Sequence, residues 1–474
     1  MEKFLKENFP DRESHSILGS TFLNPTTAAG VALGSGGTQC RKGPAYTERA
    51  LYLKISTNKW QEKVVEVVNT LGIEGMEERE LPPGRARKHM DSMAYRIDTW
   101  GRWIKEGYER DMKYSCPECT IAASDVGYAA KLCRHDSKSV SRCNADTSGP
   151  DLCRSEGKVV ILATVHDTFP KPVATKTFWL GFDSLETALQ FRKQVGLDNP
   201  ADLPVSMEYM DRDAFDVIDR AGRVLGTAIK LVGTSSPIVR RLWHVKLLIE
   251  ALPFAGAPQI IDKLIYNING LFPALLPSAI MEIGHNRDHH VAMTVGDFGD
   301  GNMERLLDRL QKFASEKGQE KIIVHECTTP KEAAALTAFR FVAAPAFRTW
   351  CVGEGVQGYS VDYALPKNGG AIPPLSSDVT TAPEPVKRMR YSHFACNVVH
   401  EDLAYGPGVD IHDAKHALKK VVEYGCGGKL PAEHGHGTEY IAPPETLNRW
   451  KKMDPLNVLN PGVGGLSEKF QYKE

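Results

Sequence analysis

The chain has 474 residues, of which 42% are hydrophobic and 25% charged, fractions that are usual for a folded soluble protein. At roughly 150 residues per domain, this length predicts two to four domains. Lysine and arginine number 58 against 59 aspartate and glutamate, so there is no electrostatic case for nucleic acid as the main partner. The polar start Met1–Ser20 lacks the apolar core of a secretory signal. No stretch approaches the ~20 apolar residues of a spanning helix, so we expect a chain that does not cross a membrane.

Half of the ten cysteines are scattered, as reduced intracellular thiols are, and the rest crowd into one stretch. That stretch contains a CPEC motif followed by CRH, and two thiolates at CxxC spacing can bind one zinc ion. A second CxxC is missing, which favours unpaired loop thiols over a structural zinc site. The crowded cysteines are Cys116, Cys119, Cys133, Cys143 and Cys153.

The first third of the chain predicts strands and loops with an insertion. Up to about residue 60, short apolar runs alternate with glycine-rich turns, and one clear strand is predicted at Ala50–Ile55. Residues from about 60 to 154 are polar and predict an insertion with some helix or irregular loops. A buried strand is predicted at Lys158–Val165 and a helix at Ser184–Val195.

The segment 237–283 has a different character, because apolar residues recur there at steps of four and three and line one face of a helix. A second helix is predicted over 259–270. On pattern alone, the two helices either pack into a core or attach to a membrane surface, with basic side chains toward anionic lipid. The residues that would carry the attachment are Arg240, Arg241, Trp243 and Lys246.

The last third predicts mixed strands and helices without a regular βαβ repeat, which favours an α+β fold over a doubly wound sheet. Residues 367–386 are rich in Pro, Ser and Thr and predict a linker or loop. The predicted strands are His289–Thr294, Lys321–His325 and His393–His400, and the predicted helices are Asn302–Ser315, Lys331–Phe341 and His412–Gly425.

A glycine cluster, Gly34, Ser35, Gly36 and Gly37, is the first candidate for chemistry. Glycines allow a ligand to approach the backbone closely and leave N–H groups free to bind phosphate. The cluster fits neither GxGxxG nor the P-loop, so a plain turn is an equally good interpretation.

Two histidines seven positions apart, His393 and His400, are the second candidate. They would share a face of a helix, but on a regular strand an odd spacing points them to opposite faces. A shared metal ion therefore requires a bend between them. Glu433 and His434, in the glycine-rich loop PAEHGHG, add one possible metal ligand and one possible base. The set His, His, Glu is a plausible divalent-metal site with an open position.

At these motifs the chain resembles the membrane-associated, FAD-containing, quinone-linked D-lactate dehydrogenases. The matching sequence segments include HSILGS, GSGGTQCRKGPAYTE, RCNAD and VHDTF. It continues with PVSMEYMDRDAFDV, RDHH, FRFVAAPAFR, RYSHFACNVVHEDLAYGPGVDIH, PAEHGHGTEYIAPPETL and DPLNVLNPGVG. These segments follow the family's order over nearly the whole chain.

The resemblance implies a set of binding residues. FAD would be contacted, largely through backbone, by Gly19, Gly36 and Ile161, and Thr26 stands where the family motif has serine. A divalent, zinc-like metal would be bound by His393, His400 and Glu433, as in the wider group of flavin-linked D-2-hydroxyacid dehydrogenases.

The resemblance also implies how the substrate is handled. His434 would remove the hydroxyl proton as hydride passes to the flavin, and Arg340 or Arg348 would bind the substrate carboxylate by a bidentate pair. It further favours the membrane interpretation of segment 237–283.

The family fold that the resemblance implies is α+β. It combines a vanillyl-alcohol-oxidase/p-cresol-methylhydroxylase-type FAD domain with an α/β cap domain that carries a helical membrane-binding segment. Family members have a longer N-terminal region that cradles the FAD pyrophosphate, so we expect this chain to begin in the second half of that domain. The expected units are 1–168 for the FAD domain with the Cys-rich insertion at about 60–154, 169–213 and 289–425 for the cap, 214–288 for membrane binding, and 426–474 for the return to the FAD domain.

The predicted function is FAD-dependent oxidation of D-lactate to pyruvate, with electrons passed to a membrane quinone. The alternatives are a dehydrogenase for another D-2-hydroxyacid, such as glycolate or 2-hydroxyglutarate, and a catalytically silent membrane-surface or zinc-binding protein. The expected location is inside the cell, peripheral on the inner face of the plasma membrane, or on the mitochondrial inner membrane in a eukaryote. The sequence leaves the oligomeric state open.

Overall fold

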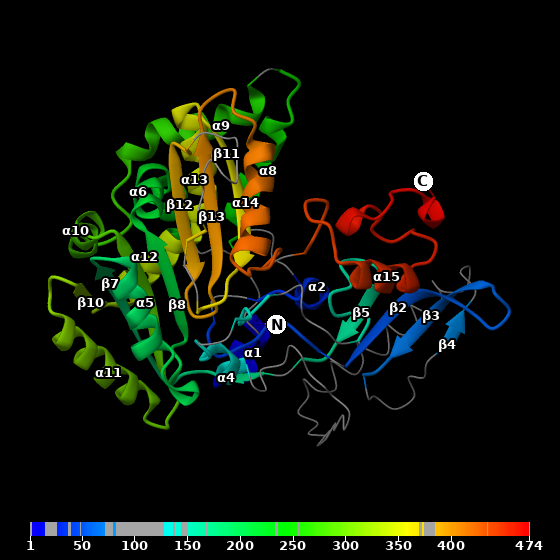
Figure 1. Ribbon diagram of the computed structural model, residues 1–474, viewed down its shortest axis with the longest axis horizontal. Coiled ribbons are helices and arrows are strands. Elements are labelled where there is room, and N and C mark those ends of the chain that lie inside the picture. The colour runs from blue at the N-terminus through cyan, green and yellow to red at the C-terminus, as the bar shows by residue number, and fades with distance from the viewer. Residues whose placement is uncertain are drawn as a thin grey trace.

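The computed structural model contains three antiparallel sheets, with helices around the largest of them (Figure 1). The residues that it describes are 2–14, 26–36, 39–47, 49–71, 79–81, 128–135, 138–143, 150–166, 168–232, 236–254, 256–368, 372–373, 384–433 and 435–473. Short elements near the start are α1 (Glu2–Asn8) and β1 (Arg12–Glu13), and β1 pairs with β6 (Phe169–Pro170).

The largest sheet has seven strands in the order β10-β7-β9-β8-β12-β13-β11. Neighbouring strands are antiparallel throughout, so the predicted α+β class is confirmed and a doubly wound parallel sheet is excluded for this unit. The strands are β7 (Ala174–Phe182), β8 (Ser206–Asp211), β9 (His289–Asp297), β10 (Ile322–Glu326), β11 (Gln357–Ala364), β12 (Lys387–His393) and β13 (Val398–Tyr405).

Helices cover both faces of this sheet. Successive side chains of each strand point to opposite faces, and both faces carry apolar side chains that the helices bury. On one face, Trp179, Met210 and Met389 pack with helices α6, α10, α12 and α13. On the other face, Phe178, Met207 and Leu403 pack with α5, α11 and α14. These helices are α5 (Leu185–Phe191), α6 (Arg212–Ala221), α10 (Ser278–Asn286), α11 (Asn302–Lys317), α12 (Pro330–Phe341), α13 (Ala343–Glu354) and α14 (Ile411–Lys420).

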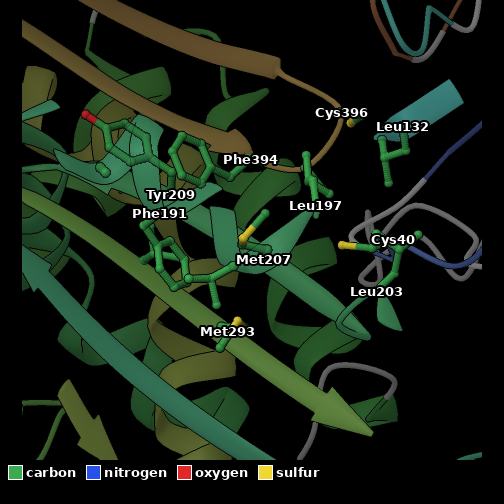
Figure 2. Close-up of a cluster of buried hydrophobic side chains, with 14 of the residues drawn as sticks. Cys40, Leu132, Phe191, Leu197, Leu203, Met207, Tyr209, Met293, Phe394 and Cys396 are labelled. Carbon is green, nitrogen blue, oxygen red and sulfur yellow. The ribbon is translucent and has the colours of Figure 1, made fainter. Parts of the chain in front are cut away.

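Figure 2 shows the core between the sheet and α5, where Phe191, Met207 and Met293 meet. The same core extends to Cys40 and Cys396, two of the cysteines that the structure describes as free and buried. Ser184 caps the start of α5, because its hydroxyl accepts a hydrogen bond from the Thr187 backbone N–H. The helix continues as a π-helical turn, η3 (Arg192–Gly196). The short helix η4 (Pro200–Asp202) follows it, and η6 (Val421–Gly425) continues α14.

A smaller sheet, in the order β4-β3-β2-β5, lies beside the large one. The C-terminal helix α15 (Pro444–Met453) packs on it, because Trp450 and Val463 share a core with Ala50 and Tyr52. The first and last parts of the described chain therefore form one unit. Its other elements are α2 (Thr27–Leu33), β2 (Ala50–Thr57), β3 (Lys63–Asn69), β4 (Arg79–Leu81), β5 (Val160–Thr164), η7 (Val463–Gly465) and η8 (Phe470–Tyr472). Helix α4 (Tyr128–Leu132) instead contributes Tyr128 and Leu132 to the core of the large sheet.

Strand β3 shows that the start of the predicted insertion was placed wrongly. Residues from about 60 onward were predicted as an insertion of helix and loop, whereas Lys63–Asn69 pairs with β2 on one side and β4 on the other. The run KVVEVVN is β-branched and places Val64, Val67 and Val68 in buried positions, which is typical of a strand. Cys116 and Cys119 of the predicted insertion lie outside the described residues.

The segment 214–288 contains three further helices, which pack on one another and on α6, α12 and α13. They are α7 (Arg223–Val232), α8 (Pro237–Glu250) and α9 (Ala257–Ile268), followed by η5 (Asn269–Leu271). The two helices predicted from the apolar pattern are thus present as α8 and α9. In the part of the chain that the structure describes, no helix has the length and apolar character needed to cross a bilayer.

Candidate active site and metal centre

A tight hairpin brings His393 and His400 together. Strand β12 ends at His393, β13 begins at Val398, and the turn between them includes Asn397 in the left-handed region, with φ of 59°. His400 pairs with Tyr391 across the ladder, so both histidines face the same side of the sheet. Their Nε2 atoms are 3.5 Å apart. The turn is the bend that the seven-residue spacing requires.

Glu433 completes this group from a loop that follows α14. Its backbone N–H donates to an Asp362 carboxylate oxygen at 3.0 Å, which fixes the loop against β11. Its Oε2 lies 3.2 Å from Nε2 of His393 and 3.9 Å from Nε2 of His400. All three ligand atoms lie within 4.8 Å of one another. Two imidazoles and a carboxylate that converge at one point are a set of three protein donors suited to a zinc-like divalent ion.

The carboxylates of Glu208 and Glu433 flank the buried imidazole of His393. Burial acts to lower the pKa of His393, but Glu208 and Glu433 outweigh it and raise that pKa to about 10. Burial acts to raise the pKa of Glu433, but His393 and Arg142 hold it well below its usual range. The site therefore holds Glu433 as a carboxylate, the form that binds metal ions.

Glu208 is a residue that the sequence analysis missed. It lies on β8 directly opposite His393, and its Oε1 is 2.9 Å from Nδ1 of that histidine. Its Oε2 accepts a hydrogen bond from Nε of Arg340 at 2.9 Å. The carboxylate orients His393 so that Nε2 faces the metal position. The available signal was the acidic residue inside the apolar run SMEYM, since a buried charge requires partners.

Of the two arginines predicted to bind a carboxylate, only Arg340 lies at this site. Its guanidinium lies 4.6 Å from the centre of the Tyr391 ring, and that ring stacks on the His400 ring at 5.1 Å. Arg348 lies instead on α13, where it pairs with Glu250 and Asp262 of the outer helices. Among the described residues, Arg340 forms hydrogen bonds only through Nε, which leaves the outer nitrogens of its fork for a ligand.

Arg142 joins the glycine cluster to the histidine group. Its buried guanidinium donates to Oε1 of Glu433, and a Cβ atom built on Gly36 would lie only 2.7 Å from its Cζ. A larger side chain at position 36 would therefore have to displace the guanidinium of Arg142. Two candidate sites that are separate in the sequence are contiguous in the structure.

The other predicted cofactor residues lie around α2 and β5. Thr26 caps α2 by accepting the Ala29 backbone N–H at 3.1 Å. Ile161 lies half-buried on β5, opposite Tyr52. Gly19 and the predicted base His434 lie outside the described residues. Two positions after His434 in the sequence, His436 is buried, and its Nδ1 lies 2.9 Å from a carboxylate oxygen of Glu156.

The residues predicted for membrane attachment divide into two groups. Arg241 is exposed on α8, whereas Lys246 is half-buried and pairs with Asp262 at 2.7 Å. Trp243 is half-buried, 5.3 Å from the Lys246 ammonium, and the side chain of Arg240 lies outside the described residues. Large apolar side chains are nevertheless exposed on both helices, namely Ile238, Leu242, Val245, Leu247, Leu248, Ile260 and Leu264.

The sequence of this chain is similar to a protein-family model and to three curated proteins. A family model described as "D-lactate dehydrogenase, membrane binding" matches residues 177–472. Quinone-dependent D-lactate dehydrogenases of Corynebacterium glutamicum, Haemophilus influenzae and Escherichia coli are 29%, 27% and 28% identical to this chain. The alignments cover 96%, 98% and 100% of this chain and 75%, 77% and 78% of those proteins.

The similarity to solved structures is weaker. p-Cresol methylhydroxylase with substrate bound has a TM-score of 0.37 at 9% identity, over 68% of this chain and 59% of its own. A 4-ethylphenol oxidase from Gulosibacter chungangensis has a TM-score of 0.41 at 9% identity, over 98% of this chain and 74% of its own. Likenesses of this size do not identify a fold.

Proposed function

The chain belongs to the membrane-binding D-lactate dehydrogenase family, as its sequence resemblance predicts, and we propose that it oxidises D-lactate to pyruvate and passes the electrons to a membrane quinone. The observation that carries the proposal is the convergence of His393, His400 and Glu433 beside Arg340. The names of the three curated relatives support the substrate and the electron acceptor.

The substrate part of the proposal rests on two kinds of group. A 2-hydroxyacid presents a carboxylate and a hydroxyl, and the fork of Arg340 is suited to the carboxylate. A divalent ion held by the two histidines and Glu433 would act as a Lewis acid on an oxygen of the substrate. His434 follows Glu433 directly in sequence, so we assign to it the removal of the hydroxyl proton.

The redox part of the proposal requires a hydride acceptor, and we assign this role to FAD. Bound FAD would supply an acceptor for a hydride, with its two electrons, from the substrate carbon, and the quinone would then take both electrons. The residues proposed for FAD are Gly19, Thr26, Gly36 and Ile161. Gly36 fits this assignment, since it lies against Arg142 and Arg142 contacts the proposed metal ligand Glu433, so cofactor and substrate would be neighbours. The vanillyl-alcohol-oxidase-type fold and the domain boundaries given above are part of this proposal.

We further propose that α8 and α9 attach the protein peripherally to an anionic membrane, on the inner face of the plasma membrane or on the mitochondrial inner membrane. The exposed apolar side chains of both helices and the exposed Arg241 support this proposal. Such a position would bring the enzyme to its quinone.

The test is an absorption spectrum of the purified chain before and after anaerobic addition of D-lactate. We expect a flavin spectrum that bleaches with D-lactate and not with L-lactate. Bleaching with glycolate or 2-hydroxyglutarate but not with D-lactate would instead identify another D-2-hydroxyacid as substrate. A colourless protein that stays colourless after FAD is added would contradict the enzymatic proposal and favour a silent membrane-surface or zinc-binding protein.

A further inference from the structure

A cavity of about 280 Å³ lies beneath α8, between this helix and α7, α9 and α13. Its walls are formed mainly by apolar side chains, among them Leu225, Ala228, Leu242, Ile249, Ile261 and Ala346. At about 30 Å³ per water, the space would hold roughly nine molecules of that size, but apolar walls offer them few hydrogen-bond partners. The cavity is therefore suited to a hydrocarbon group.

Helix α8 is packed loosely over this cavity. None of its side chains that the structure describes is fully buried, whereas an amphipathic helix normally buries one face in the core. Leu242 and Val245 line the cavity and still expose 59% and 47% of their surface. Each square ångström of apolar surface left in water costs about 25 cal/mol, so an apolar occupant would stabilise the helix in place.

The polar end of the cavity is already satisfied. Asp262 is buried, and its carboxylate accepts hydrogen bonds from Lys246 at 2.7 Å and from Thr349 at 3.0 Å. Arg348 adds a third bond at 3.0 Å. Because these partners occupy the Asp262 carboxylate, it does not recruit a polar ligand, and recognition falls to the apolar walls.

We propose that this cavity holds the hydrocarbon chain of one membrane phospholipid. The proposal rests on the membrane attachment proposed above, because the cavity is lined from the same helix that exposes Ile238, Leu242 and Leu248. A lipid chain that leaves the bilayer would enter between α8 and its neighbours, with its headgroup near Arg241. A single hydrocarbon chain, rather than a second copy of the protein, matches a partly open space of this volume.

The cavity is tested first without a membrane. The purified full chain is titrated with 11-bromoundecanoate, a single-chain amphiphile whose bromine quenches nearby tryptophan fluorescence. Trp243 lines the cavity, so we expect a saturable loss of fluorescence at one amphiphile per protein. The Trp243→Phe variant should lose this signal while the other tryptophans remain. Absence of saturable quenching in the unmodified chain would overturn the proposal.

The second test of amphiphile binding uses variants in which a larger side chain fills the cavity. Ala228→Phe places a ring in the cavity and should abolish the saturable quenching of Trp243, and Ala228→Leu serves if the phenylalanine prevents folding. The matched control is Ala334→Phe, at an exposed alanine of α12, which should bind as the unmodified chain does. Equal quenching in both Ala228 variants and the control would place the amphiphile elsewhere and overturn the proposal.

Vesicle experiments separate the cavity from the membrane attachment on which it depends. Ala228→Phe should still sediment with phosphatidylglycerol vesicles, while chain-brominated phosphatidylglycerol should quench Trp243 only in the unmodified chain and the control. Failure of the unmodified chain to sediment would contradict the membrane attachment. Sedimentation with equal quenching in Ala228→Phe would contradict the lipid chain in the cavity. Quenching by a brominated quinone tail but not by the brominated lipid would also overturn the proposed occupant.

Discussion

Glu208 links His393 to Arg340, since its two carboxylate oxygens contact Nδ1 of the histidine at 2.9 Å and Nε of the arginine at 2.9 Å. One side chain on β8 thus orients both a proposed metal ligand and the proposed carboxylate-binding residue. The arrangement predicts that metal affinity and substrate affinity change together when this side chain is altered.

Glu208→Gln should weaken metal binding by about 10- to 100-fold, because the carboxylate that orients His393 is lost. The measurement is competition for the metal with a chromophoric chelator. Glu316→Gln, at an exposed position on α11, removes the same charge and should leave metal affinity unchanged. Equal metal affinity in Glu208→Gln and the unmodified chain would show that Glu208 does not support the site.

Arg340→Lys should lower kcat/KM for D-lactate by about 30-fold, mainly through KM, since a lysine cannot form the bidentate pair and about 2 kcal/mol of binding is lost. The comparison variant is Arg348→Lys. Because Arg348 pairs with Glu250 and Asp262 away from the histidines, its dye-linked activity should stay close to that of the unmodified chain. The reverse ranking would exchange the roles of the two arginines.

Treatment with a strong chelator should abolish D-lactate oxidation, and a divalent ion should restore it. Glu433→Gln should not be restored at the same metal concentration, because an amide is a poorer ligand than a carboxylate. Metal analysis of the dialysed protein provides the independent readout. Full activity in protein that contains no metal would contradict the proposed site.

Lys367 predicts a pH dependence of stability. Burial, and then the charge of Arg192, lowers the pKa of Lys367 to about 7, while its ammonium donates to the carbonyls of Leu132 and Ala395. In the unfolded chain the pKa is about 10.4, so between pH 7 and 10 the unfolded chain binds more protons and this residue makes stability rise with pH. The slope is at most about 1.4 kcal/mol per pH unit.

The check for Lys367 is urea unfolding of the unmodified chain and of Lys367→Met at pH 7 and pH 9. The free energy of unfolding of the unmodified chain should increase relative to that of the variant as the pH rises. A constant difference between the two proteins would show that the pKa of Lys367 is not lowered in the folded state.

Arg241→Glu should weaken binding to anionic vesicles by on the order of tenfold, since each basic residue near the surface contributes about 1 kcal/mol. Lys312→Glu on α11 makes the same charge change at an exposed position and should have little effect. Lys246→Glu should act differently, because it leaves the buried carboxylate of Asp262 without its closest ammonium and should lower stability. Unchanged vesicle binding in Arg241→Glu would remove that residue from the membrane surface.

The elements with a strong apolar period could be predicted from sequence. The helices α8, α9, α11 and α12 and the strands β2, β5, β9 and β10 lie where the pattern places them, with ends shifted by a few residues. β3 was missed because its valines come in two adjacent pairs, without a clear alternation, at the edge of a polar region. Periodicity reports one element at a time, so it gives no information on which strands become neighbours.

The same limit applies to the site. His393, His400 and Glu433 could be named from motifs, but their convergence depends on a turn at Asn397 and on the loop bond from Glu433 to Asp362. Glu208 and Arg142 come from β8 and from residues before β5, and no local pattern associates them with the histidines. Arg340 and Arg348 both come from the run FRFVAAPAFR, but they lie on different helices, α12 and α13, and pair with different carboxylates.

The position of Glu433 has a consequence for the whole chain. The two histidines belong to the seven-stranded sheet, while Glu433 precedes the C-terminal segment that packs on the four-stranded sheet through Trp450 and Val463. Glu433 is itself held against β11 by its bond to Asp362, so an ion bound by all three residues would fix the loop from which the C-terminal segment leaves the large sheet. Metal loss should therefore be detected by hydrogen exchange in both units, with faster exchange near α15 as well as in β12 and β13.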